Sequence, residues 1–566
     1  MILMSKYNYK RRESSVARAG KVEIGGDNPI RIQSMCNTNT NDTDASAAQS
    51  LRIAGAGGEL VRLTTQGVKE AANMANIKKA LLEAGCDVPL VADVHFNPNA
   101  AFEAAATCDK VRINPGNFVD AARTFKKLEF TDEEYAQELE KIRSKFVPFL
   151  RLCREHSTCV RLGVNHGSLS DRIMSRYGDT PAGMVESAME FLRVCVRHGF
   201  RDVVISIKAS NVGVMVETMR RLVAAMDAED MHFPLHLGVT EAGDGEDGRI
   251  KSAVGIGTLL AEGIGDTIRV SLSEPPECEI PVARAIVDIV GEFEKATPLD
   301  AELSEGYDPV APRRRMSAPI AGLGSDSMPA VIGADSTAEY DDDCRPDLFL
   351  DSPQVKFRRI KASQLLDSKP DFAPEDVILL SSDSANPVAE MRAAFHALVR
   401  SEVTNPVVLA VSYDGMSADE ATLRAAIHCG AVMMAGFGDG LLIEGNALTP
   451  ARAARVAFAI LQSCRLRFSH TEFISCPGCG RTLFDLQSTL ADVKRATSHL
   501  KGLKIGVMGC IVNGPGEMAD ADYGYVGAGA GRISLYRGKE CVEKNIPAHE
   551  AVEHLVELIK ADGNWK

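Results

Sequence analysis

Short apolar runs alternate with helical patterns from about residue 20 to residue 290, and this alternation limits the fold more than any other feature of the chain. The stretches between the runs carry apolar residues at helical spacing, as Met184, Ala188 and Phe191 do. Eight successive strand and helix units predict an α/β fold with an N-terminal TIM barrel, and a doubly wound open sheet is the structural alternative. The predicted strands lie at residues 30–35, 60–64, 90–94, 110–113, 158–164, 202–208, 235–240 and 267–272.

The composition changes after the eighth unit, and this change divides the chain into three predicted parts. Residues 1–295 form the predicted barrel. Residues 296–350 are rich in Pro, Ser, Asp and Arg, which is typical of a linker with loosely ordered surface segments. Strand-like runs at 377–380, 407–411 and 432–435 predict a middle α/β domain. Together with the linker this domain spans residues 296–465, and we expect it to act as a spacer. Residues 466–566, with a cysteine cluster, a glycine-rich stretch, short strands and a closing helix, predict an α+β domain.

The overall composition argues against several classes of protein. With 45% hydrophobic and 25% charged residues the chain resembles an ordinary globular protein, and no apolar run approaches the roughly 20 residues of a membrane span. The polar, basic start lacks the apolar core of a signal peptide. A net charge of −14 argues against general binding to nucleic acid or anionic membranes. Most of the 14 cysteines stand singly in apolar stretches, which fits reduced thiols and predicts a cytoplasmic protein.

Five of the predicted barrel strands end on a cation. Because the carboxyl ends of all barrel strands meet at one mouth, these charges would repel one another unless an anion compensated them. Arginine and lysine with nearby hydrogen-bonding side chains match a phosphate-rich ligand, and a diphosphate is the natural choice. The predicted ligand-binding residues are Arg62, Arg112, Asn114, Arg161, Asn165, Lys208, Arg269 and Ser271.

Two other strand ends carry carboxylates. Asp93 is followed two residues later by His95, and Glu241 follows the seventh strand. A carboxylate among many cations should stay ionised, and it could then accept a proton from a substrate. For Asp93 a structural pairing with arginine is the alternative, with His95 orienting it. Glu241, which flexible glycines follow, is the stronger candidate for catalysis.

The last domain contains a concentrated group of metal-ligating residues. Cys476 and Cys479 form a CxxC pair, and Cys510 follows in a loop that continues through Asn513 to Glu517. Three thiolates suit a soft metal but are too few to close a tetrahedral zinc site, and no second CxxC follows. A [4Fe–4S] cluster with one non-cysteine ligand is the better fit, with Glu517 as a displaceable fourth ligand. Together with the cationic mouth, this cluster predicts reductive chemistry on an oxygen-rich diphosphate.

Four segments resemble the 4-hydroxy-3-methylbut-2-enyl diphosphate synthase family, and the run at 165–181 with the extra middle domain resembles its three-domain form, found in plants and some bacteria. The four segments are SCPGCGRT at 475–482, MGCIVNGPGE at 508–517, IQSM at 32–35 and NHGSL at 165–169. The resemblance covers the barrel and the last domain, and both motifs of the last domain are highly specific. Cys36 stands where the family leads us to expect threonine.

The resemblance implies a reaction and an assignment of residues. In that reaction 2-C-methyl-D-erythritol 2,4-cyclodiphosphate is opened and dehydrated with two electrons to 4-hydroxy-3-methylbut-2-enyl diphosphate, in the methylerythritol phosphate route to isoprenoids. Cys476, Cys479, Cys510 and Glu517 would hold the [4Fe–4S] cluster, and the eight residues at the barrel mouth would bind the diphosphate. Glu241 would assist proton transfer, and Asn513 would approach the substrate. Reduced flavodoxin or ferredoxin would supply the electrons.

Two matters stay open at the level of sequence. The rival interpretation is a zinc-stapled protein that binds phosphorylated metabolites without redox activity. The sequence also leaves open whether the chain acts alone or as a homodimer, and so whether barrel and cluster meet within one chain or between two.

Overall fold

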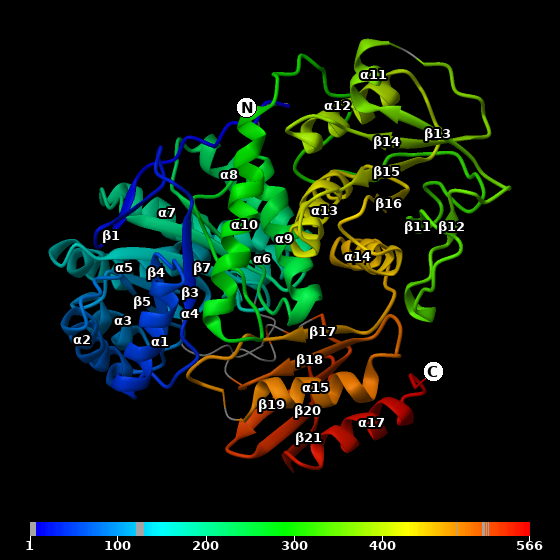
Figure 1. Ribbon diagram of the computed structural model, residues 1–566. Coiled ribbons are helices and arrows are strands. Elements are labelled where there is room, and N and C mark those ends of the chain that lie inside the picture. The colour runs from blue at the N-terminus through cyan, green and yellow to red at the C-terminus, as the bar shows by residue number, and fades with distance from the viewer. Residues whose placement is uncertain are drawn as a thin grey trace.

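The computed structural model describes residues 7–119, 129–368, 370–482, 484–511, 516, 518 and 520–565. In this part of the chain the strands form a closed barrel, a six-stranded sheet, a five-stranded sheet and a two-stranded hairpin. Figure 1 shows the barrel on the left, the six-stranded sheet beside it and the five-stranded sheet below both. No helix in these described ranges is both long and apolar enough to cross a membrane.

The barrel is closed by parallel pairing of the strands around a ring, with the last strand beside the first. The predicted TIM barrel is therefore confirmed, and the doubly wound alternative is wrong. The last two strands end earlier than predicted, because the chain beyond Leu237 and Ile268 turns toward the five-stranded sheet. The strands are β3 (Arg31–Met35), β4 (Leu60–Thr65), β5 (Leu90–Val94), β6 (Lys110–Ile113), β7 (Cys159–Asn165), β8 (Val203–Lys208), β9 (Leu235–Leu237) and β10 (Thr267–Ile268).

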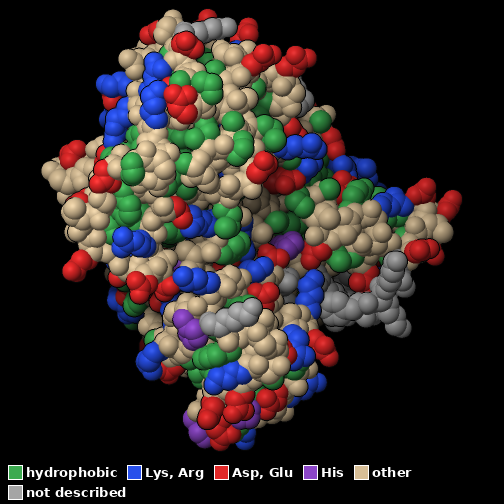
Figure 2. Space-filling view, turned by 90° about the vertical axis from the view of Figure 1, so that its right-hand side faces the viewer, with side chains coloured by type: hydrophobic (Ala, Val, Ile, Leu, Met, Phe, Trp, Pro, Cys, Tyr) green, Lys and Arg blue, Asp and Glu red, His purple; other side chains and the backbone are tan. Residues whose placement is uncertain are grey.

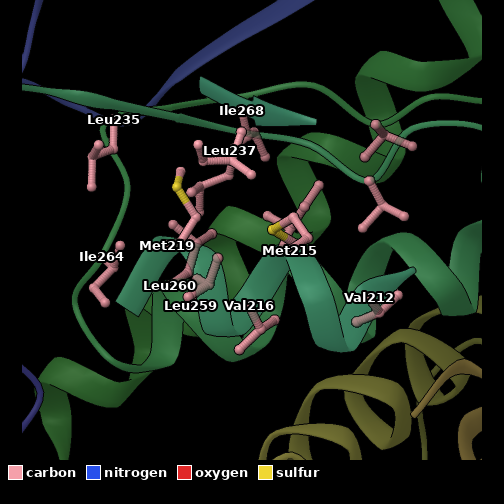
Figure 3. Close-up of a cluster of buried hydrophobic side chains, with 14 of the residues drawn as sticks. Val212, Met215, Val216, Met219, Leu235, Leu237, Leu259, Leu260, Ile264 and Ile268 are labelled. Atoms are coloured by element: carbon pink, nitrogen blue, oxygen red, sulfur yellow. The ribbon is translucent and has the colours of Figure 1, made fainter. Parts of the chain in front are cut away.

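Helices cover the outside of the barrel and pack apolar side chains against its strands. In Figure 3, side chains of α8 and α9, such as Met215, Met219 and Leu259, point toward Leu237 of β9 and Ile268 of β10. The hairpin of β1 (Ala17–Ala19) and β2 (Val22–Ile24) closes the amino end of the barrel with a small apolar cluster. The barrel helices are α1 (Thr43–Gly55), α2 (Val68–Glu83), α3 (Pro98–Ala105), α4 (Pro115–Phe118), α5 (Asp132–Glu155), α6 (Asp171–Tyr177), α7 (Pro181–Arg197), α8 (Val212–Ala228), α9 (Gly245–Ala261) and α10 (Glu279–Gly291).

The middle sheet is wholly parallel, in the order β12-β11-β16-β15-β14-β13. Its strands are β11 (Ala330–Gly333), β12 (Leu348–Phe349), β13 (Lys356–Lys361), β14 (Asp376–Ser381), β15 (Val407–Ser412) and β16 (Gly440–Glu444). The predicted strands at 377–380 and 407–411 are confirmed. The interpretation of residues 296–350 as a loose linker is wrong for β11 and β12, which lie in this sheet.

The predicted strand at 432–435 is also wrong, because this stretch is the end of α13 (Ala418–Met433) and the turn after it. Its residues are apolar on every side because α13 is buried against both the barrel and the middle sheet. Glycines allow the contact with the barrel: a Cβ added at Gly257 of α9 would lie 2.6 Å from Ile427 of α13, and one at Gly430 would lie 2.9 Å from Val254. The other helices of the middle sheet are α11 (Ala362–Asp367), α12 (Pro387–Arg400) and α14 (Pro450–Ser463).

The last sheet is mixed, and in the part of the domain that the structure describes it carries two helices, in agreement with the predicted α+β arrangement. Strands β17 (Glu472–Ser475), β18 (Lys504–Met508) and β19 (Tyr523–Gly529) are parallel, and β20 (Arg532–Arg537) and β21 (Glu540–Pro547) continue the sheet in antiparallel pairing. Helices α15 (Leu486–Thr497) and α17 (Ala551–Ala561) pack on it. The cysteine pair directly follows β17, and Cys510 follows β18.

Candidate active site

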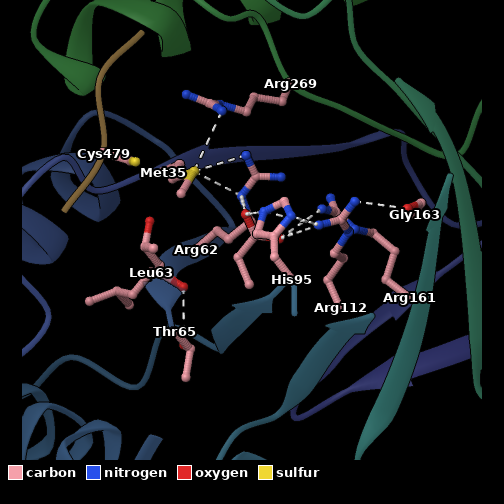
Figure 4. A network of polar contacts seen from close by, with 12 residues as sticks. Met35, Arg62, Leu63, Thr65, His95, Arg112, Arg161, Gly163, Arg269 and Cys479 are labelled. Carbon is pink, nitrogen blue, oxygen red and sulfur yellow. Dashed lines mark hydrogen bonds and ion pairs between the residues drawn. The ribbon is translucent and has the colours of Figure 1, made fainter. Parts of the chain in front are cut away.

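Four of the predicted cations lie on barrel strands, and the fifth, Arg269, directly follows β10. Arg112 and Arg161 are fully buried, and Arg62 and Arg269 are nearly so. Adjacent parallel strands align Arg112 with Arg161, so their guanidinium groups lie in one layer, as Figure 4 shows. The barrel therefore concentrates positive charge in a molecule whose pictured surface mixes both signs (Figure 2).

Asp93 lies at the centre of this charge. Its carboxylate oxygens are 3.4 Å from Arg112, 3.8 Å from Arg62 and 3.9 Å from Arg161. Burial alone would raise the pKa of Asp93, but the surrounding cations outweigh it and hold the pKa well below its ordinary value. One carboxylate cannot balance three guanidinium groups, so the layer retains positive charge.

His95 contacts the same layer. Its ring lies 3.3 Å from the carboxylate of Asp93 and 2.8 Å from Nη1 of Arg112. Burial and the charge of Arg112 hold the pKa of His95 well below its usual value, so the ring is neutral. His95 therefore acts as a hydrogen-bonding spacer between Asp93 and Arg112.

Arg161 has an unusual environment for a buried cation. None of its three guanidinium nitrogens has a hydrogen-bond partner among the described residues, although Asp93 is 3.9 Å away. Removing a charge from water without such partners is costly, so this side chain is poised for an anion. Arg62 is also poor in partners, since its hydrogen bonds go to the thioether of Met35 at 2.8 and 3.0 Å, a weak acceptor.

Arg269, in contrast, is well paired. It donates to both carboxylate oxygens of Glu279, at 2.9 and 3.1 Å, and Ser34 donates to the same carboxylate at 2.6 Å. This network fixes the Arg269 side chain beside the pocket. Lys208 and Ser271 line the pocket with it.

The two predicted asparagines play structural parts in this conformation. Asn114 caps α4, because its side-chain oxygen accepts a hydrogen bond from the backbone N–H of Gly116 at 3.0 Å. The side-chain oxygen of Asn165 accepts a hydrogen bond from Arg112. Both asparagines are buried and neither lines the described pocket.

Glu241 lies where the barrel meets the last sheet. It is buried and lines the pocket, and its backbone has φ +52°, a left-handed conformation that non-glycine residues seldom adopt. Strain of this kind is typical of functional sites, where the surrounding structure holds it in place. The next residue, Ala242, pairs with Ser475 of β17 as a parallel bridge.

One pocket contains both halves of the predicted site. Residues of the barrel and of the last sheet line it together. Its lining includes Arg62, Asp93, Lys208, Glu241, Arg269 and Ser271 from the barrel, and Cys476, Cys479, Arg481 and Cys510 from the last domain. Because all of these residues belong to one chain, the two halves meet within a single molecule.

The cysteine thiols in this pocket receive hydrogen bonds suited to thiolates. The backbone N–H of Gly509 donates to Cys476 at 3.3 Å, and Nε of Arg481 donates to Cys479 at 3.3 Å. Burial raises the pKa of Cys476. At Cys479 burial also acts to raise the pKa, but the charge of Arg481 and the hydrogen bonds to the sulfur together outweigh it and lower the pKa. Thiolates are soft, anionic ligands, and N–H groups that hydrogen-bond to their sulfurs stabilise them. This arrangement fits an iron–sulfur cluster.

Part of the predicted ligand set cannot be placed. Asn513 and Glu517 lie outside the described residues. Within the described ranges, no three His, Cys, Asp or Glu side chains converge as a site for one metal ion. The fit of a cluster therefore rests on the chemistry of the three thiols and their shared pocket.

At two glycines the backbone of the barrel loops directly contacts the backbone of the last domain. A Cβ added at Gly480 would lie 2.6 Å from the carbonyl oxygen of Thr38, in the loop after β3. One added at Gly167, in the loop after β7, would lie 2.5 Å from the carbonyl oxygen of Gly516. Glycine is required at both positions because the two backbones touch.

Sequence reasoning missed three residues of this site. Met35 and Glu279 contact the barrel arginines, and Arg481 contacts the cysteine pair. Glu279 gave no signal, because only the closed barrel brings it to Arg269. Met35 stands in the IQSM segment at 32–35, but nothing in that segment indicates a contact with an arginine. Arg481 could have been noticed, since a cation two residues from a cysteine stabilises its thiolate.

Comparison with known proteins identifies the family. A family model described as the GcpE TIM-barrel domain matches residues 14–284, and one described as the GcpE protein C-terminal domain matches residues 472–561. The 4-hydroxy-3-methylbut-2-en-1-yl diphosphate synthase (flavodoxin) of Parabacteroides distasonis is 54% identical, over 99% of this chain and 100% of its own. Proteins of the same name from Bacteroides fragilis and Porphyromonas gingivalis are 53% and 49% identical, over 100% of this chain and 98% and 100% of their own. The chain therefore belongs to the GcpE family of 4-hydroxy-3-methylbut-2-en-1-yl diphosphate synthases.

Proposed function

We propose that this protein converts 2-C-methyl-D-erythritol 2,4-cyclodiphosphate to 4-hydroxy-3-methylbut-2-enyl diphosphate. The cyclic diphosphate takes up two electrons and two protons, its ring opens, and one water leaves. The observation that carries the proposal is the pocket that cationic barrel residues and the cysteine loops line together. Named relatives at about half identity over the whole chain support the same reaction.

The barrel residues bind and orient the diphosphate. Arg62 and Arg161 lack strong acceptors, so phosphate oxygens would complete their hydrogen bonding. Arg269, held by Glu279, offers a fixed guanidinium edge. Arg112, Asn114, Asn165, Lys208 and Ser271 complete the proposed set, in which Asn114 and Asn165 act by positioning α4 and Arg112.

Glu241 handles a proton at the substrate. It is buried in the pocket wall next to the bridge that joins the barrel to β17, so its carboxylate faces both the cations and the cysteines. A carboxylate in this position can hold a substrate hydroxyl and move its proton as that hydroxyl leaves as water. Because Glu241 is itself buried, bulk water has little access to its side chain.

Cys476, Cys479 and Cys510 would hold a [4Fe–4S] cluster, with Glu517 as the fourth ligand. When bound, the cluster supplies electrons one at a time and acts as a Lewis acid toward a substrate oxygen. The names of the relatives support reduced flavodoxin as the electron donor. Since the described lining comes from one chain, we propose that a monomer suffices for turnover.

Anaerobic turnover of the cyclic diphosphate tests the proposal, with reduced flavodoxin and ferredoxin compared side by side. We expect four irons per chain, a broad visible absorption and faster turnover with flavodoxin. Colourless protein with one zinc and no turnover would favour the rival zinc-stapled binding protein instead.

A matched pair of variants localises the cluster. Cys479→Ser should lose iron, whereas Cys541→Ser, in the same sheet but outside the pocket lining, should keep it. Equal iron loss in both variants would contradict the proposed ligand set.

A further inference from the structure

Arg481 is a buried cation in the wall of the site with an unusual set of partners. It is 8% exposed, and Nε donates to the thiol of Cys479 at 3.3 Å. Among the described residues no carboxylate forms an ion pair with it. Arg465 of the same region, in contrast, pairs with Glu472 at 2.9 Å. A buried guanidinium needs a counter-charge, and around Arg481 the thiolates of Cys479 and Cys510 supply more of it than Asp93 does.

The position of Arg481 in the pocket also matters. The same pocket is lined by Cys476, Cys479 and Cys510 and, from the barrel, by Asp93 and Arg62. Arg481 is the one cation that the last domain contributes to the described lining. It therefore stands at the boundary between the cysteines and the diphosphate site.

We propose that Arg481 is a positioning residue that sets the reduction potential of the cysteine-bound group. This inference rests on the proposed cluster. Adding an electron makes an anionic group more negative, and a fixed positive charge beside one of its thiolates stabilises that state. A hydrogen bond to the ligating sulfur acts in the same direction, because it withdraws charge from the sulfur. Loss of the Arg481 charge should therefore lower the midpoint potential and make the group harder to reduce.

Reductive titration of the full-length, cluster-loaded protein without substrate tests this. The variants are Arg481→Gln, which removes the charge, and Arg481→Lys, which keeps it. Arg495→Gln is the control, because Arg495 lies on α15 of the same domain with a side chain that is 76% exposed. The readout is the fraction of reduced cluster at each potential, measured by electron paramagnetic resonance and visible absorption.

At a fixed potential we expect the ratio of reduced to oxidised cluster to fall about tenfold in Arg481→Gln, which is about 59 mV for one electron. Arg481→Lys should stay within about threefold of the parent, and Arg495→Gln should match it. Because no substrate is present, contact between Arg481 and a diphosphate cannot produce the shift.

An unchanged midpoint in Arg481→Gln, or an equal shift in Arg495→Gln, would overturn the proposal. Arg481→Gln could fail to hold iron. In that case the proposal is supported if Arg481→Lys binds iron fully and has the midpoint potential of the parent protein, because lysine keeps the positive charge. Loss of iron from the lysine variant as well would overturn the proposal. Iron and sulfide content of the parent protein, measured first, tests the proposed cluster separately from the role of Arg481.

Discussion

Ala242 and Ser475 pair as an isolated parallel bridge, which makes the loop after a barrel strand and the first strand of the last sheet continuous through backbone hydrogen bonding. Each residue adjoins a proposed functional group, Glu241 on one side and Cys476 on the other. Ser273 strengthens the junction, since its hydroxyl lies 2.8 Å from that of Ser475 and 3.0 Å from the carbonyl oxygen of Cys476. The carboxylate proposed to handle the proton and the first cysteine are thus held by one backbone junction.

Gly480→Ala should separate the two halves of the site. The added Cβ would lie 2.6 Å from the carbonyl oxygen of Thr38, and backbone cannot move aside as a side-chain end can. We expect turnover to fall about tenfold to hundredfold, since small displacements of reacting groups have effects of this size. Gly291→Ala is the control, because a Cβ there meets nothing within 4 Å. Parental turnover in Gly480→Ala would refute the close contact.

Arg161→Met should stabilise the ligand-free protein and weaken substrate binding. The substitution removes a buried charge that has no hydrogen-bond partner among the described residues. We expect a gain of about 1–3 kcal/mol in unfolding free energy and a loss of at least tenfold in affinity for the cyclic diphosphate. Chemical denaturation and calorimetric titration measure the two effects.

Arg172→Met provides the contrast for that variant. Arg172 is also buried but pairs with Glu190 at 2.7 Å, so its loss leaves a buried carboxylate without its cation and should cost about 3–5 kcal/mol. Equal destabilisation by both variants would show that the charge of Arg161 is compensated in the folded protein.

Lys110 should make stability depend on pH. It is fully buried in β6, and burial lowers its pKa from 10.5 to about 7. Between these values the unfolded chain binds a proton that the folded protein does not, so this residue makes stability rise with pH by about 1.4 kcal/mol per unit. Lys110→Met should therefore be more stable than the parent at pH 7.5, with the difference shrinking toward pH 9.

Denaturation at several pH values checks this, with Lys79→Met as the control because the Lys79 side chain is 75% exposed. A difference between parent and Lys110→Met that stays constant from pH 7.5 to pH 9 would show that Lys110 remains charged in the folded protein.

Glu472→Gln should loosen the last sheet from the barrel. Glu472 forms an ion pair with Lys251 of α9 at 3.0 Å and another with Arg465 at 2.9 Å. The side chains of Glu472 and Lys251 are both buried. Weakening these pairs by about 2–3 kcal/mol should speed amide hydrogen exchange in β17 by roughly tenfold to hundredfold, with the barrel strands unchanged. Exposed Glu557 provides the control substitution. Uniform acceleration across all strands would instead mean global destabilisation.

The barrel could be predicted because its strands are short apolar runs in a regular series, and β5 and β6 begin and end where the sequence indicated. The middle sheet was harder to predict. Strand β13 is a charged edge strand, KFRRIK, without an apolar face, and residues 432–435 are apolar because α13 is buried on all sides. Local pattern cannot separate a buried helix end from a buried strand.

The candidate site shows the same division. The rule that barrel strand ends meet at one mouth brought the five cations together correctly, since it depends only on topology. It could not show that Arg161 would lack hydrogen-bond partners, or that Arg481 would have thiols in place of carboxylates, because these depend on packing between distant segments. The roles of the individual residues in catalysis stay predictions.

The glycine-lined contact between α9 and α13 has a mechanical consequence. Close-packed helices resist sliding, so the barrel and the middle sheet should move together as one rigid unit. The chain leaves this unit at the end of α14 and reaches β17 through residues 464–471. A movement of the last sheet away from the barrel would therefore have to bend this short connector and break the bridge between Ala242 and Ser475.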